Sequence, residues 1–437
     1  MLKIRTIGIV SLAVVVLTSP SVLLAQDTTE TGYQLDLELG LLHSDNPLGN
    51  NPSGPSDSFL VPRAQFDVQR GGSRWQARGS GHMEYRMSME DVVEDEFRAN
   101  LAAAVDWTLL PGLEWTFQNV ASVEPIDFLG TDSSDNLQQT NVLMTGPVWQ
   151  IRPMSVWGGV VDARYTHSHA EESKAFDSDR FSASGRLLRR FDANRQASVG
   201  AEVTDVQFRD AEFADADHQR LDLLARYGTR AALTELELAV GHTWIDPDQG
   251  ENISALLARM QLTWNRDGIH SLHLLAQHEL SDTTRQLTSE IDRIGRHFAG
   301  DSRLPIGAGI YRLSSIEPGW RYRYPRGELS VRPFYRDFDF EFTPDVDFDE
   351  FGVALRGSLR IRPRTTLLAS IGADRRRFEL DQRRDTDLLS TLFLAHRFAP
   401  RWSGRVGAVR FQRDSNIPAA DSRELVVSAY LTFHAGR

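Results

Sequence analysis

Cysteine is absent from this chain of 437 residues, and long apolar runs are absent beyond its N-terminal segment. Without cysteine the chain has no disulfide framework and no thiolate metal site. No later stretch approaches the ~18 consecutive apolar residues that a transmembrane helix needs. Lysine is almost missing as well, since Lys3 and Lys174 are the only two, so arginine supplies nearly all of the positive charge. A GC-rich genome explains that bias more simply than a functional choice does.

Charge and composition narrow the class of protein further. The net charge of −12 at pH 7 does not suit a nucleic-acid partner. The length would suggest two or three soluble domains, yet we find no linker between them. Hydrophobic residues make up 41% of the sequence, and strands with one apolar and one polar face average to such a value.

An alternating pattern recurs from residue 33 almost to the end of the chain. Every second residue over 33–41, 75–85 and 425–433 is apolar or small, and polar residues stand between them. Period-two alternation places one face of a strand against apolar surroundings and the other against water. When it runs for roughly 10 residues per segment and the polar face is charged, the apolar surroundings are lipid. We therefore predict an all-β fold, a transmembrane antiparallel up-and-down β-barrel.

The N-terminal segment predicts export. Lys3 and Arg5 precede a largely apolar stretch over 7–17, and 22–25 offers a cleavage site before Gln26. This is the organisation of a secretory signal peptide. We therefore expect a signal peptide over 1–25, which is cleaved, and a single outer-membrane β-barrel domain over 26–437.

Turn residues fix the expected number of strands. Gly, Pro, Asn and Asp dominate the short connections, because tight turns need positive or fixed φ angles. Nine short connections are predicted at 70–73, 110–112, 152–153, 192–194, 228–230, 266–268, 325–327, 362–364 and 399–401. Ten longer ones are predicted at 44–57, 87–95, 124–136, 168–178, 209–217, 246–252, 281–306, 342–348, 379–386 and 413–421. They separate about 20 strands, or 18 to 22 if a hairpin is miscounted.

Tryptophans and the longest loop each allow two interpretations. The nine tryptophans fall near strand ends, as the aromatic girdles of a membrane barrel do, although in a soluble β-protein they would anchor a core. In the 281–306 loop, Ile291, Ile294 and Phe298 have helical spacing after a cap at 288–290. This loop would form a lid, a constriction of the lumen or a mobile exterior segment.

The polar face of the strands predicts an arginine-rich lumen. Its acidic residues are fewer, and include Asp36, Glu38, Glu84, Glu279 and Asp374. We expect six arginines on three successive strands to form a basic patch that binds anions: Arg321, Arg323, Arg332, Arg336, Arg356 and Arg360. Rings of arginine in a pore favour anions, and guanidinium groups pair with carboxylates and phosphates. In the alternative, Asp337, Asp374 and loop acids neutralise these arginines, which then only solvate the wall.

Catalytic and metal-binding signals are weak. His167 and His169 place two imidazoles on one side of an extended segment, but no third ligand follows at a recognisable spacing. The acidic loops, such as 90–96 and 345–350, would share divalent cations with lipopolysaccharide phosphates or simply be solvated. We therefore expect no enzyme activity, no cofactor and no bound metal.

Short motifs in the first half resemble one family of barrels. The chain has Ser-Asp-Asn at 44–46, Trp-Thr-Phe-Gln-Asn at 115–119, Asp-Asn-Leu-Gln-Gln-Thr-Asn-Val at 135–142 and Gly-Pro at 146–147. These motifs resemble the outer-membrane barrel proteins associated with PEP-CTERM and exopolysaccharide gene clusters, best over 33–208. The resemblance implies an outer-membrane barrel with a part in polysaccharide secretion, and it brings no catalytic residues. The chain departs from the usual barrel ending, because His434 to Arg437 follow the terminal aromatic Phe433.

Two functions fit these patterns. The first is a porin-like or export channel linked to the secretion of anionic exopolysaccharide. The second is a non-conducting barrel that serves as a surface anchor, a structural partner or a rim hydrolase. We favour the channel, because a barrel of about 20 strands has an aqueous interior unless something fills it. The expected partners are outer-membrane lipid and lipopolysaccharide, the barrel assembly machinery and polysaccharide secretion proteins.

Overall fold

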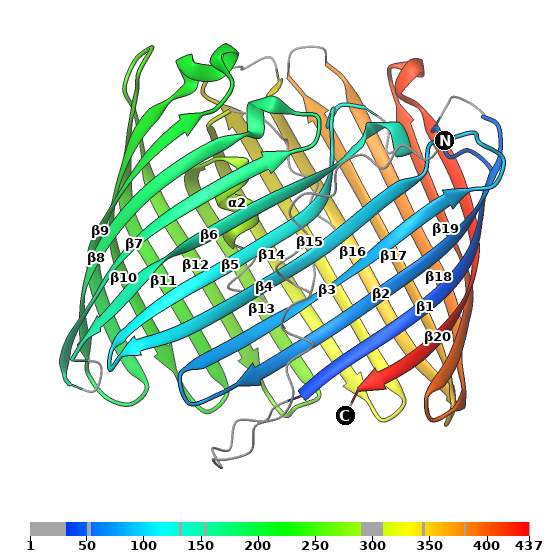
Figure 1. Cartoon of the computed structure of the whole chain (residues 1–437), viewed down its shortest axis with the longest axis horizontal. Coiled ribbons are helices and arrows are strands. Elements are labelled where there is room, and N and C mark those ends of the chain that lie inside the picture. Colours follow the sequence, from blue (N-terminus) through cyan, green and yellow to red (C-terminus); the bar gives the residue numbers. More distant parts are fainter. Residues whose placement is uncertain are drawn as a thin grey trace.

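The structure, a computed structural model of the chain, describes residues 32–49, 54–130, 133–152, 155–289, 309–342, 346–379 and 382–436. The predicted signal peptide over 1–25 lies outside these residues, and so does most of the predicted 281–306 loop. Figure 1 shows a single barrel of tilted strands.

Twenty antiparallel strands make one continuous sheet within the described residues, which confirms the predicted number. The first ten are β1 Gly32–Ser44, β2 Asp57–Gly71, β3 Trp75–Ser88, β4 Glu96–Leu110, β5 Leu113–Pro125, β6 Leu137–Ile151, β7 Trp157–Ala170, β8 Ser178–Arg190, β9 Arg195–Phe208 and β10 His218–Arg230. The others are β11 Thr234–Pro247, β12 Ile253–Asn265, β13 His270–Ser281, β14 Tyr311–Tyr324, β15 Gly327–Phe340, β16 Phe348–Arg362, β17 Thr365–Phe378, β18 Arg384–Ala399, β19 Trp402–Ser415 and β20 Ser422–Gly436. Helical segments in the connections are η2 Ser134–Asn136, η3 Lys174–Phe176, η4 Ala211–Ala216, α2 Thr283–Ser289 and η7 Pro418–Ala420.

The barrel closes between its first and last strands. Each strand pairs with its neighbours in sequence, and β1 pairs with β20 from Gln34 opposite Gly436 to Ser44 opposite Val426. The residues after Phe433 continue this strand, and the His434 imidazole hydrogen-bonds Asp36 on β1 at 2.8 Å. Closure gives every described strand a partner on both sides and leaves no free edge, as a lipid-embedded sheet requires.

The two faces of the barrel differ as the alternation predicted. On β1, the side chains of Leu37, Leu39 and Leu41 are 46% to 56% exposed, whereas Asp36 between them is 8% exposed. The apolar residues of β20, such as Val427, also face outward. The outer face is therefore an apolar belt suited to lipid, and the interior, here called the lumen, is polar. No helix in the described part of the chain is long and apolar enough to cross a membrane.

The tryptophans lie mostly on the outer face near strand ends, which favours an aromatic girdle over core anchors. Trp75 stands opposite Trp107, and Trp107 opposite Trp115, in one row across β3, β4 and β5. Trp107, Trp149 and Trp157 are 50% to 54% exposed. Large rings exposed in a row beside the short turns suit the headgroup level of a bilayer.

The connections differ in length between the two ends of the barrel. Nine short connections lie at the end where β1 begins and β20 finishes, here called the short-turn end. In the turn between β4 and β5, Gly112 has φ of +83°, a conformation that favours glycine. The ten longer connections all lie at the opposite end, here called the long-loop end, as bacterial barrels arrange their exterior loops.

Candidate functional site: the lumen and its mouth

Ion pairs line the lumen. Glu84, 5% exposed, accepts hydrogen bonds from Arg63 and Arg86, and Glu279, 2% exposed, accepts them from Arg259. Glu38 on β1 accepts a hydrogen bond from Arg405 at 3.1 Å across the closing seam. Glu38, Glu84 and Glu279, three of the inward acids expected from the sequence, are therefore already paired with arginines.

The six arginines of the predicted basic patch lie on β14, β15 and β16, on lumen-facing positions. Arg321 stands opposite Ser330, which stands opposite Arg356 on the next strand. Arg323 stands opposite Glu328, and Arg336 opposite Glu350. Arg332 and Arg360 also face the lumen, because each lies four positions along its strand from another lumen-facing arginine, Arg336 or Arg356. The structure thus brings the predicted residues to one wall.

Three glutamates on the same wall neutralise part of this charge. Arg336 bonds Glu317 at 2.9 Å and Glu350 at 3.3 Å, while Arg321 and Arg323 share Glu328 at 3.2 and 3.1 Å. Arg332 and Arg356 also have interaction partners. Six arginines set against these three glutamates leave a formal excess of three positive charges among these nine lumen-facing residues.

Of the two acids that the sequence suggested as neutralising, Asp337 lies on the outward face, whereas Asp374 lies beside Arg376 and has a further interaction partner. Asp337 stands opposite Ser314 and Asp349 on the outward face, and Asp374 lies 3.7 Å from Arg376 on β17. Glu317 lies where the β14–β15 pairing is interrupted, between Ile316 and Trp320, and its alternation with Arg321 and Arg323 is the signal that places it in the lumen. Glu350 had been assigned to an exterior loop, although β16 begins at Phe348.

A short helix after β13 lies inside the barrel. The Asp282 carboxylate accepts a hydrogen bond from the backbone N–H of Arg285 at 3.1 Å, and α2 follows over Thr283–Ser289. Leu287, 2% exposed, packs in a cluster with the lumen-facing Val120, Val142 and Met144. In Figure 1, α2 accordingly appears behind β6. The part of the 281–306 loop that the structure describes therefore narrows the lumen.

Charged groups fix this helix to the wall formed by β8, β9 and β10. Arg285 lies 3.1 Å from Asp222, and Asp282 lies 2.8 Å from Arg180. Burial alone would raise the pKa of the Asp282 carboxyl, but the Arg180 guanidinium holds it well below its usual range. Burial would lower the pKa of Arg285, but Asp222 and Glu202 raise it above the usual value. Asp282 and Arg285 are thus both charged at neutral pH. Their attraction to Arg180 and Asp222 on the barrel wall holds α2 in place.

The helix was missed by the sequence analysis, which expected helical structure at 291–298 and a cap at 288–290. The described helix instead ends at Ser289, and 291–298 lies outside the described residues. Its signal was the Asp-Thr-Thr sequence at 282–284, since Asp before a helix is a common N-cap.

The loop between β5 and η2 reaches the opposite wall at the long-loop end. The Phe128 ring lies 5.7 Å from that of Phe348 and 6.5 Å from that of Phe340, at the ends of β15 and β16. The Leu129 carbonyl accepts a hydrogen bond from Arg383 at 2.6 Å, and that of Gly130 accepts one from Arg413 on β19. In a closed sheet of twenty strands, β5 and β15 are half the circumference apart.

These contacts show that the mouth is narrow. Two residues separate Pro125, the end of β5, from Phe128, and the three steps along the chain span at most about 10 Å when extended. A circular barrel of twenty strands would have a backbone diameter of about 40 Å, from its strand spacing and tilt. The end of β5 must therefore lean toward β15 and β16, so the opening at the long-loop end is constricted.

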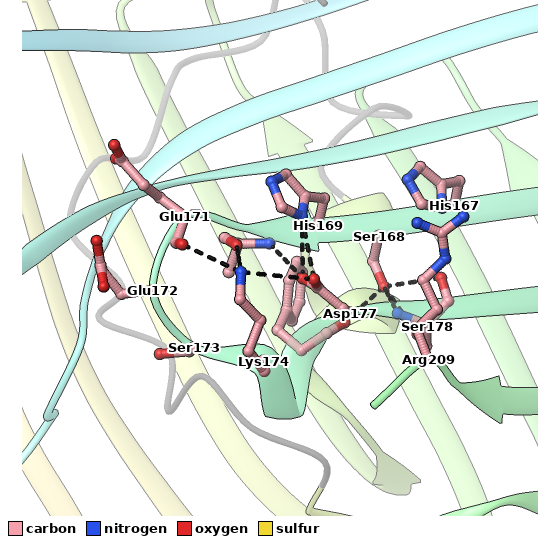
Figure 2. A network of polar contacts seen from close by, with 12 residues as sticks. His167, Ser168, His169, Glu171, Glu172, Ser173, Lys174, Asp177, Ser178 and Arg209 are labelled. Atoms are coloured by element: carbon pink, nitrogen blue, oxygen red, sulfur yellow. Dashed lines mark hydrogen bonds and ion pairs between the residues drawn. The ribbon is translucent and has the colours of Figure 1, made fainter. Parts of the chain in front are cut away.

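The two histidines considered as metal ligands lie apart from the lumen. They lie near the long-loop end of β7, and the His169 Nδ1 atom hydrogen-bonds Asp177 at 3.1 Å (Figure 2). His167 instead bonds Asp179 at 2.9 Å. Each imidazole thus has its own carboxylate, and no group of three or more His, Cys, Asp or Glu side chains among the described residues could hold a metal ion.

Comparisons with known proteins bear on the fold. No family model and no curated protein matches the chain, so the resemblance to PEP-CTERM-associated barrels stays a prediction. Among solved structures, a mutant ferric enterobactin receptor of Pseudomonas aeruginosa is 10% identical, with a TM-score of 0.48, covering 94% of this chain and 81% of its own. The siderophore receptor PirA of Acinetobacter baumannii is 8% identical, with a TM-score of 0.49 and the same coverage. A copper transporter, OprC, is 11% identical, with a TM-score of 0.46, again covering 94% and 81%.

The expected function needs correction. These three solved barrels are titled as receptors for siderophores or as a copper transporter, not as porins, exopolysaccharide exporters or enzymes. The prediction of a porin-like or export channel for exopolysaccharide is therefore wrong, and with it the partnership with polysaccharide secretion proteins. A mouth crossed by the β5–β6 connection also does not suit a general pore. Likeness at this level says nothing of what the chain itself binds.

Proposed function

We propose that the protein is an outer-membrane transport barrel that takes up small anionic solutes selectively. The apolar belt on the outer face and the polar lumen support a position in lipid. The proposal includes the lipopolysaccharide leaflet as surroundings, the barrel assembly machinery as the route of insertion and a cleaved signal peptide.

The observation that carries this proposal is the clustering of six arginines on the lumen side of β14–β16, where they outnumber the three glutamates of the same face. Arg356 and Arg360 on β16 are exposed to the lumen, and the glutamates of this wall are engaged by Arg321, Arg323 and Arg336. Fixed positive charge on a pore wall raises the local concentration of anions and lowers that of cations.

Selectivity by size follows from the two constrictions. The β5–β6 connection narrows the mouth, and α2 takes up part of the lumen between β6 and β10. A helix is about 10 Å across with its side chains, so α2 alone does not fill a barrel of this strand number. These two constrictions therefore favour the passage of small solutes over that of polymers.

Entry of matched sugars into liposomes that contain the refolded chain tests this function. Gluconate, glucose and glucosamine are similar in size but carry negative, zero and positive charge. We expect gluconate to enter fastest and glucosamine slowest. The variant R332Q/R356Q/R360Q should lose the preference while remaining folded, and R195Q/R266Q, two exposed turn arginines, should keep it. Equal entry of the three sugars into liposomes with the native protein would refute the proposal.

A further inference from the structure

A second group of arginines faces the lumen on another part of the wall, formed by β8–β12. Arg226 on β10 stands opposite Ser198 on β9 and Ala239 on β11, and Ala239 stands opposite Arg259 on β12. Arg186 on β8 stands opposite Gly200 on β9. Neighbouring strands are about 4.8 Å apart, so Arg226 and Arg259 are separated by about 10 Å of backbone.

Small residues between these arginines leave space above the wall. A Cβ atom added at Gly200 would come within 2.5 Å of the Cγ atom of Arg186. The stem of Arg186 therefore lies across β9, over Gly200. Ser198 and Ala239 add little volume on either side of Arg226, which is exposed to the lumen.

The acids nearby are already engaged by other cations. Glu279 is held by Arg259, while Asp222 and Glu202 lie 3.1 and 3.9 Å from Arg285 of α2. The electrostatic neighbours of Arg226 are three arginines (Arg186, Arg259 and Arg285) and one acid, Glu202. Across the described part of the chain, no hydrogen bond or ion pair reaches the side chain of Arg186 or Arg226.

We propose that Arg186 and Arg226, flanked by Arg259 and Arg285, bind an oxyanion of the transported solute. The inference rests on the proposed uptake of anions and names the chemical class of the group recognised, a phosphate or a carboxylate. Planar guanidinium groups bind such groups through paired N–H donors, and a bound anion relieves the repulsion among the arginines. Because Arg285 belongs to α2, this helix forms one side of the site.

Isothermal titration calorimetry of the refolded full chain in detergent tests the site, with inorganic phosphate and malonate as separate probes. We expect the native protein to bind at least one probe. In R186Q/R226Q the affinity should fall about tenfold or more, as expected when charge-assisted hydrogen bonds are lost. In R186K/R226K the loss of affinity should be smaller, because the lysines keep the positive charge although they lack the paired N–H donors of a guanidinium group. R195Q/R266Q should bind as the native protein does.

The outcomes separate this site from the proposed function. Heat-modifiable migration on gels verifies that each variant is folded. Unchanged affinity in folded R186Q/R226Q, or no binding of either probe by the native protein, overturns the site. If binding depends on Arg186 and Arg226 but gluconate has no advantage in liposome entry, the uptake proposal fails and the site stands.

Discussion

Replacing Asp222 by asparagine should strongly destabilise the barrel, because this carboxylate is the centre of the network that docks α2. Asp222 is 0% exposed and accepts hydrogen bonds from Arg220 at 2.9 and 3.0 Å and from Thr243 at 2.5 Å. Arg285 lies 3.1 Å away. The amide would leave the buried Arg220 without the carboxylate that it bonds, and Arg285 without the nearer of its two carboxylate partners. Removing one partner of a buried ion pair costs about 3–5 kcal/mol.

Urea unfolding of the refolded protein in lipid vesicles, followed by tryptophan fluorescence, measures this loss. Asp192→Asn is the matched control, since Asp192 pairs with Arg195 at 2.7 Å in an exposed turn and its loss should leave the midpoint unchanged. Asp222→Asn combined with Arg285→Met should recover part of the stability, because one unpaired charge is removed. A midpoint for Asp222→Asn equal to that of Asp192→Asn would refute the reasoning.

Three further predictions concern the lipid face, the mouth and pH. Leu37→Arg on the outward face should lower the free energy of unfolding by about 2–4 kcal/mol if the residue lies at the bilayer midplane. Cysteine scanning along β1 should label odd positions from lipid and even positions from water. Labelling without this alternation would contradict the assigned orientation of the strand. Phe128→Ala should release the β5–β6 connection from Phe348, so that a larger sugar such as maltotriose enters liposomes faster, and unchanged entry would mean that this contact does not limit passage. Asp282 has a lowered pKa in the folded state, so its contribution to docking is full above the unfolded value of about 3.9 and is lost as pH falls through the lower folded value. A spin label at Thr288→Cys should therefore stay immobilised from pH 8 to about 5 and gain mobility only under strongly acidic conditions, whereas release near neutral pH would contradict the assignment.

The number of strands, and which side chains face lipid or the lumen, could be predicted from the sequence because both depend on local signals. Turn residues such as Gly112 mark the short connections, and the period of two assigns Leu37 to lipid and Asp36 to the lumen. The placement of Arg321, Arg336 and Arg356 on one wall followed from the same counting.

Contacts between distant segments could not be predicted in this way. Phe128 meets Phe348 across the mouth, and Leu287 of α2 joins the cluster that contains Val142 on β6, because closure of the barrel brings these segments together. No periodicity within a strand encodes such contacts. The pairing of Arg336 with Glu317 and Glu350 depends on the register of the neighbouring strands. A shift of one residue would turn these side chains to the opposite face of the sheet.

The reversal potential of the native barrel in a planar lipid bilayer tests the central claim most directly. With a tenfold KCl gradient, an excess of positive charge on the lumen wall predicts a potential whose sign reports chloride preference. The preference should shrink in R332Q/R356Q/R360Q and persist in R195Q/R266Q. A potassium preference, a potential of zero or the absence of conductance in the native protein would contradict selective anion uptake.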